Sequence, residues 1–99
     1  MTALWISHVT VTDPESYGLY AKAAGPAIAA YGGEFLARGG RYRQMEGTER
    51  ARNVVARFPS FDAAVACYNS PEYQAALVHA RGASERDLVI VEEAKPAEG

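Results

Sequence analysis

One segment of the sequence places an arginine in a short apolar run, where its charge would need a partner. The run covers residues 34–38, and Arg38 stands two positions after Leu36, on the same face of a regular strand. A guanidinium on an otherwise apolar face needs a carboxylate or a bound anion. Arg38 therefore either reaches solvent, pairs with an acid across a subunit contact, or holds the anionic or enolate oxygen of a small ligand.

A second segment, residues 68–74, combines tyrosines with a helix start. Ser70 precedes Pro71, and a serine at this position caps a helix whose free N–H groups attract an anion or a carbonyl oxygen. Tyrosine offers an apolar ring with one hydroxyl, which suits a small aromatic or acyl ligand. We expect one cavity lined by Arg38, Tyr68, Ser70 and Tyr73. The alternative is that this segment only caps a helix and packs in the core.

Groups that could transfer a proton or bind a metal are few. His8 and Asp87 are the candidates for a general base. His8, His79 and Cys67 are the strong nitrogen and sulfur ligands, and their spacing fits no metal site, so we expect none. The sequence has no phosphate-loop, dinucleotide-binding or nucleophile-elbow motif, so we expect no cofactor. Cys67 is expected to be a small buried apolar side chain.

The elements that would position these residues follow from hydrophobic periodicity and from turn residues. We expect strands at 4–11, 34–38, 52–58 and 87–92, and helices at 13–31, 60–68 and 70–80. Gly32 and Gly33 would end the first helix. The order β, α, β, β, α, β, with the second helix broken in two, is that of the ferredoxin-like α+β fold. We expect one domain over 1–94 and a flexible C-terminal tail over 95–99.

The predicted strands are apolar on both faces. Val54 and Val55 are adjacent, and residues 88–91 are all apolar. Helices cover only one face of a ferredoxin-like sheet, and a sheet with one face in water should alternate apolar and polar residues. A second copy of the sheet is the simplest cover for the other face, so we expect a homodimer.

The charge of the chain argues against a nucleic-acid partner, because the 99 residues carry a net charge of −2. Residues 38–57 contain six arginines and two glutamates. This segment is either a solvated hairpin or a local field for an anionic ligand. No stretch approaches the roughly 18 apolar residues of a membrane span, and the first residues lack a signal-peptide pattern. We therefore expect no membrane partner and a cytoplasmic location.

Several short motifs, taken together and in order, resemble a known protein family. They are Asp13-Pro14 with Tyr17, Tyr31-Gly32-Gly33, Phe35 to Gly40, Glu46-Gly47, Phe58 to Phe61, Tyr68 to Gln74 and Leu88 to Glu92. Over nearly its whole length the sequence is similar to the bacterial domain of unknown function 1330. This resemblance implies a dimeric α/β barrel, in which two ferredoxin-like sheets face each other. Tyr17 and Asn69 lie in the motifs, and we add them to the candidate ligand-binding residues.

The superfamily implied by this resemblance includes cofactor-free quinol monooxygenases, haem-degrading enzymes, muconolactone isomerases and ligand-sensing domains, so the fold does not settle the function. In one hypothesis the protein is a monooxygenase or isomerase without a bound cofactor, acting on a small anionic or phenolic metabolite. Arg38 would hold the oxyanion, Tyr68 and Tyr73 would orient the ring, and His8 or Asp87 would act as the base. In the other hypothesis it is a non-catalytic ligand-binding or stress-response protein using the same cavity.

Overall fold

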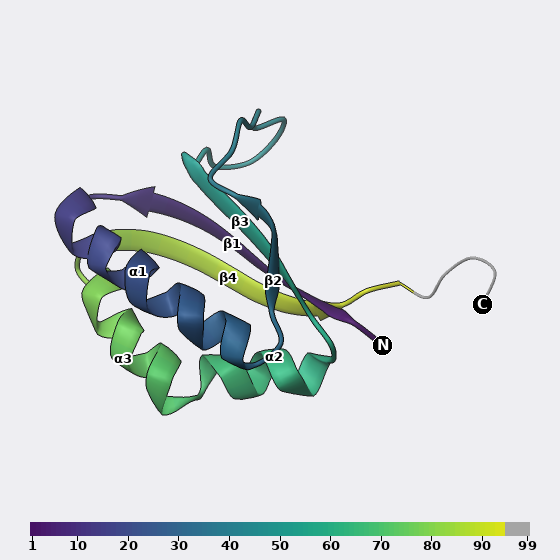
Figure 1. Cartoon of the computed structure of the whole chain (residues 1–99). Helices are drawn as coiled ribbons and strands as arrows, with labels where there is room; N and C mark the ends of the chain where they lie inside the picture. The colour runs from purple at the N-terminus through teal and green to yellow at the C-terminus, as the bar shows by residue number, and fades with distance from the viewer. Residues whose placement is uncertain (95–99) are drawn as a thin grey trace.

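The computed structural model describes residues 1–94, and the tail expected at 95–99 lies outside the described residues. The described elements are β1 (Ala3–Val11), α1 (Pro14–Ala30), β2 (Glu34–Arg38), β3 (Arg52–Phe58), α2 (Phe61–Tyr68), α3 (Pro71–Ala80) and β4 (Ser84–Glu92) (Figure 1). The predicted order is confirmed, including the break between α2 and α3. β4 begins at Ser84, before the expected position 87, because Ser84 already pairs with Val11 of β1.

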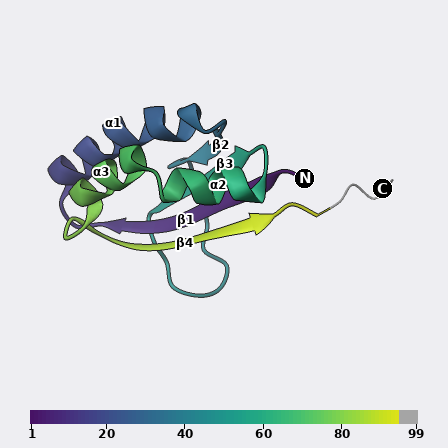
Figure 2. The same ribbon diagram turned by 90° about the horizontal axis from the view of Figure 1, so that it is seen from below.

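The strands form one sheet in the order β2-β3-β1-β4, and every neighbouring pair is antiparallel. With α1 connecting β1 to β2 and α2–α3 connecting β3 to β4, this is the ferredoxin-like fold. Figure 2 shows the helices together on one side of the sheet. β1 lies between β3 and β4, so its inward side chains occupy the centre of the helix-covered face.

Side-chain caps fix where the helices begin. Asp13, Ser60 and Ser70 each accept a hydrogen bond from the backbone N–H three residues later. Such a cap satisfies an N–H that has no partner inside the helix and contributes about 1 kcal/mol. Capping, one of the two roles considered for Ser70, is therefore present.

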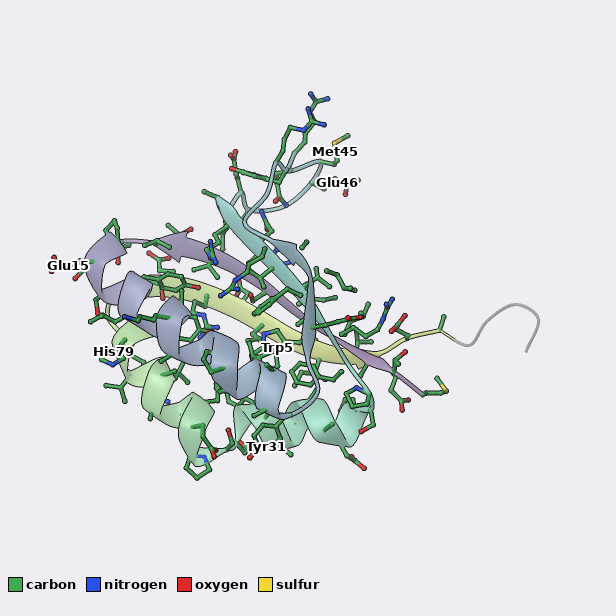
Figure 3. All side chains as sticks on the ribbon, in the orientation of Figure 1. Trp5, Glu15, Tyr31, Met45, Glu46 and His79 are labelled. Carbon is green, nitrogen blue, oxygen red and sulfur yellow. The ribbon has the colours of Figure 1, made fainter. Side chains whose placement is uncertain are left out.

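Trp5 is the central side chain of the core and lies between the sheet and the helices (Figure 3). Its ring stacks on Phe58 with 5.6 Å between centroids and meets Tyr73 edge-on at 5.0 Å. Aromatic pairs in these geometries add about 0.5–1.5 kcal/mol each to the gain from burial. The helix-covered face is therefore held mainly by large aromatic side chains.

The opposite face of the sheet is apolar and uncovered in a single chain. Ile6 lies between Val55 of β3 and Val89 of β4, and Leu4 lies beside Val91. Val89 is 55% exposed and Val91 is 45% exposed. The loop between β2 and β3 extends beyond the sheet on this same side (Figure 2). We call this surface the open face; its apolar character supports the expected homodimer, which stays a prediction.

We predict that Val89→Asp converts a dimer to a monomer, because it would bury an unpaired carboxylate between two sheets at a cost of several kcal/mol. Val78→Asp is the matched control, since Val78 is 61% exposed on α3, away from the open face. Sedimentation velocity at micromolar concentration should give twice the chain mass of 10.6 kDa for the parent and the control, and the chain mass for Val89→Asp. A monomeric parent would contradict the barrel arrangement.

Gly32 and Gly33 end α1 for different physical reasons. Gly32 has φ of +85°, as expected for a helix-ending glycine, whereas a Cβ on Gly33 would lie 2.5 Å from Ile28 Cγ2. Alanine at either position should lower the free energy of unfolding by about 1 kcal/mol or more in urea titrations. Gly18→Ala, in open space on α1, should raise it by about 0.4–1 kcal/mol. If the Gly32→Ala and Gly33→Ala variants both unfold at the same urea concentration as the parent, α1 can end elsewhere and the prediction is contradicted.

Candidate functional site

A hollow opens between α1 and the helix-covered face of the sheet, and we call it the α1 hollow. Its aromatic walls and its polar groups are Trp5, Tyr17, Tyr20 and Phe35, with Ser7, Arg38 and Arg52. It encloses about 20 Å³, and the unfilled space reaches about 340 Å³ when its mouth toward solvent is included. The enclosed part is sized for water, so a larger ligand must displace a side chain at the mouth.

A β-bulge decides where Arg38 points. Phe35 pairs with Ala56, but Arg38 pairs with Val54, because the register shifts between Phe35 and Ala37. The extra residue places Arg38 on the helix-covered face together with Phe35. Arg38 therefore lies toward a largely apolar face, as expected, although the regular alternation with Leu36 that the sequence predicted is interrupted by the bulge.

The Arg38 side chain lies across the mouth of the α1 hollow. Its guanidinium carbon is 4.1 Å from the centroid of the Phe35 ring, and its Nη2 lies beside Gly25 of α1. A cation over a phenyl ring at an exposed site gains about 0.5–1 kcal/mol. Such a contact holds the guanidinium loosely enough for an incoming ligand to displace it.

Arg52 is the second cation of the α1 hollow. It stands next to Val9 on the helix-covered face, with its guanidinium carbon 5.8 Å from the centroid of the Tyr17 ring. Its Nε is buried and has no hydrogen-bond partner among residues 1–94. In that part of the chain the ion pairs involve Arg50 and Arg57, and neither Arg38 nor Arg52 meets a carboxylate. The hollow therefore has a positive charge that the described residues do not neutralise.

Three polar groups meet behind the α1 hollow, and we call them the tyrosine–arginine cluster. Arg86 Nη2 donates hydrogen bonds to the hydroxyl of Tyr20 at 3.0 Å and to that of Tyr73 at 2.9 Å. The two hydroxyl oxygens are 2.7 Å apart. Burial raises the pKa of Tyr20 and of Tyr73 above the ordinary value, so both stay neutral at physiological pH.

Sequence reasoning missed Arg52, Arg86 and Tyr20. Arg86 alternates with Leu88 and Ile90, so the strand period places its charge on the same face as these two apolar side chains. A charged residue at such a position is a signal that could have revealed it. Arg52 alternates in the same way with Val54 and was read only as part of a basic segment. Tyr20 looked like one more apolar position of α1.

The structure brings Tyr17 together with Arg38 in the α1 hollow, but places the other predicted ligand-binding residues elsewhere. Tyr68 and Asn69 line a separate hollow of about 240 Å³ beside β4. Tyr73 is fully buried against Trp5, and the Ser70 hydroxyl donates to the Cys67 carbonyl while capping α3. The single cavity expected for Arg38, Tyr68, Ser70 and Tyr73 therefore does not form among the described residues.

The two candidate bases lie on the open face, across the sheet from Arg38. His8 Nδ1 donates to Asn53 Oδ1 at 2.6 Å, and Asp87 accepts from Arg50 Nε at 3.0 Å. His8 and Asp87 are neighbours across β1 and β4. No carboxylate or imidazole of residues 1–94 lines the α1 hollow. Arg38 and either candidate base cannot therefore reach the same ligand atom within one chain.

The remaining candidate group is Cys67, which is fully buried as expected. Burial raises the pKa of its thiol to about 11, so the nucleophilic thiolate is not formed near neutral pH. Within residues 1–94 no three metal-ligating side chains come together. The same part of the chain contains no helix long and apolar enough to cross a membrane.

Comparison with solved structures supports the fold. A protein of unknown function from Rhodopseudomonas palustris is 22% identical, with a TM-score of 0.76 over 96% of this chain and 84% of that one. SnoaB, a cofactor-independent oxygenase from Streptomyces nogalater, is 13% identical, with a TM-score of 0.69 over 99% and 98%. A dimeric ferredoxin-like protein of unknown function from Thermobifida fusca is 20% identical, with a TM-score of 0.65 over 94% and 92%.

No curated protein matches the sequence significantly. A family model does match, and it covers residues 2–94, which include every strand and helix of the sheet-and-helix unit described above. The chain belongs to the family of the domain of unknown function DUF1330.

Proposed function

We propose that the protein binds a small aromatic anion, a carboxylate or a phenolate, in the α1 hollow. The observation that carries this proposal is the unneutralised charge of Arg38 and Arg52, with the buried Arg52 Nε lacking a partner in the described chain. A buried donor without an acceptor costs about 1–3 kcal/mol, more when it is charged, so a site of this kind is stabilised by an anion. The binding unit we propose is a cytoplasmic homodimer.

The walls of the α1 hollow favour a flat ring over an inorganic anion. Tyr17, Tyr20 and Phe35 surround the cations, and Trp5 forms part of the wall toward the core. Aromatic side chains stack on a ligand ring, while a guanidinium binds a carboxylate through two parallel hydrogen bonds. The ligand would enter by moving the exposed side chain of Arg38 away from Phe35.

Binding of benzoate and para-nitrophenolate tests the proposal by isothermal titration calorimetry. Arg52→Gln should weaken both affinities by about 10- to 150-fold, the value of one charge-assisted hydrogen bond. Arg38→Lys should weaken the carboxylate more, because lysine lacks the two-pronged donor. Arg43→Gln is the control, since it removes an exposed arginine of the β2–β3 loop.

Thermal unfolding separates a ligand site from a structural role for Arg52. The parent bears the cost of a buried, unpartnered Nε, so Arg52→Gln should unfold at the same temperature as the parent or higher. Unchanged affinity in Arg52→Gln, or equal losses in the Arg43→Gln control, would contradict the proposed site.

A second candidate function is cofactor-free oxygenation of a bound phenolate. The lining of the α1 hollow favours it over isomerisation, because the polar side chains among the described residues there can donate hydrogen bonds and none is a carboxylate or an imidazole that could act as the base. The similar fold of SnoaB, a cofactor-independent oxygenase, also supports it. A phenol and dioxygen would give a quinone and water, with one oxygen atom entering the ring and the other leaving as water.

Oxygen uptake with alpha-naphthol distinguishes this function from binding alone. An oxygenase should consume one dioxygen per quinone formed, measured with an oxygen electrode and by quinone absorbance. The rate should survive metal chelation and should fall in Arg52→Gln. Tight binding of the phenol without oxygen uptake would favour the non-catalytic ligand-binding or stress-response function.

A further inference from the structure

The tyrosine–arginine cluster contains two phenolic protons, and the hydrogen bond between the two hydroxyls uses only one of them. Arg86 donates to both hydroxyl oxygens, and these oxygens lie 2.7 Å apart, so one O–H donates to the other. Each tyrosine has a single O–H, and the second proton finds no acceptor among residues 1–94 within hydrogen-bond distance. One of the two hydroxyls must therefore offer its proton to something else.

Burial indicates which tyrosine carries the free proton. Tyr73 has no exposed surface and is enclosed by the rings of Trp5, Tyr20 and Tyr68, with centroids 5.0, 5.9 and 5.4 Å away. Tyr20 is 7% exposed and lines the α1 hollow. A proton without an acceptor is costly in a dry core and much less so beside a hollow that admits water or a ligand. The favoured arrangement has Tyr73 donating to Tyr20, and Tyr20 offering its proton to the hollow.

Arg86 strengthens this donor. No carboxylate of residues 1–94 pairs with Arg86, and its Nε is buried without a partner there. Its guanidinium carbon lies 4.8 Å from the centroid of the Tyr20 ring. A hydroxyl oxygen that accepts bonds from a guanidinium and a second phenol is polarised, and its own proton becomes a better donor.

We propose that Tyr20 is the residue that recognises a second oxygen on the ligand, while Arg86 and Tyr73 position its hydroxyl. The inference rests on the proposed function, in which Arg38 and Arg52 hold the anionic end. Tyr17 lies between the two ends, with its ring 5.0 Å from that of Tyr20 and 5.8 Å from the guanidinium carbon of Arg52. The substrate class is then an aromatic anion that also has a carbonyl, phenolic or similar acceptor oxygen.

Two nearly isosteric probes isolate this contact, para-acetylbenzoate with an acceptor oxygen and para-isopropylbenzoate without one. The parent should bind the acetyl probe more tightly, by about 3- to 10-fold, the value of one neutral hydrogen bond. Tyr20→Phe should abolish this preference. Tyr73→Phe, which removes the hydroxyl that positions Tyr20, should reduce the preference without abolishing it, because Tyr20 retains its own proton. Arg52→Gln should weaken both probes equally and keep the preference.

Each outcome of this calorimetric comparison supports or overturns the inference. A preference that survives Tyr20→Phe, or no preference in the parent, overturns the role of Tyr20 and leaves the anion site standing. Loss of the preference in Tyr73→Phe instead would place the free proton on Tyr73 and overturn the assignment. Binding of neither probe by the parent removes the proposed function and the inference together. If Tyr20→Phe fails to fold, meta-fluorotyrosine at position 20, a stronger donor, should increase the preference, and an unchanged ratio would overturn the inference.

Discussion

Helices cover only one face of the sheet. The buried polar side chains therefore lie in a single thin layer between the helices and the sheet, and they must find their hydrogen-bond partners within it. Three arginines extend from strand positions on that face, and each lies near an aromatic ring. The guanidinium of Arg38 is over Phe35, that of Arg52 is near Tyr17 and that of Arg86 is over Tyr20. In this layer each of these arginines has an aromatic ring as its neighbour in the place that a carboxylate would normally occupy. Such contacts stabilise a cation without neutralising it, so the layer keeps a positive potential.

On the open face, in contrast, the arginines are paired with carboxylates. Arg50 bonds to Asp87 at 3.0 Å and lies 3.6 Å from Glu85, and its Nη1 donates to Thr10. These pairs lie at the end of the sheet near the β2–β3 loop, and the ion pair of Arg57 with Glu93 lies toward the other end of the same face, beside Leu4. Neutralised charge on one face and unneutralised charge on the other are consistent with the two separate roles that we propose. The open face is suited to contact another protein surface, and the helix-covered face is suited to contact an anion.

The fold could be predicted from the sequence to a large extent because its signals are local. Alternation, the serine caps and the glycine pair at the end of α1 each act over a few residues, and together they leave one order of elements. The site was predicted less well because it depends on contacts between distant segments. Tyr73 appeared to flank a helix start, but the turn at Ser70 directs its ring into the core against Trp5. Arg86 lies in no recognisable motif. It meets Tyr20 of α1 only because its position on β4 directs its side chain toward the helices.

The bulge in β2 has a consequence for how relatives of this chain should be aligned. Leu36 is the residue without a cross-strand partner. Because this bulge lies between Gly33 and Arg38, the face on which Arg38 lies depends on the number of residues between Arg38 and Gly39, and not on the number between Gly33 and Arg38. A homologous strand that is one residue shorter could present the same guanidinium to the same hollow, with the deletion absorbed at position 36. Counting forward from the end of α1 would then misassign the cation by one residue. Structure-guided gaps at this position, rather than sequence identity, would reveal whether the cation has been retained across the family.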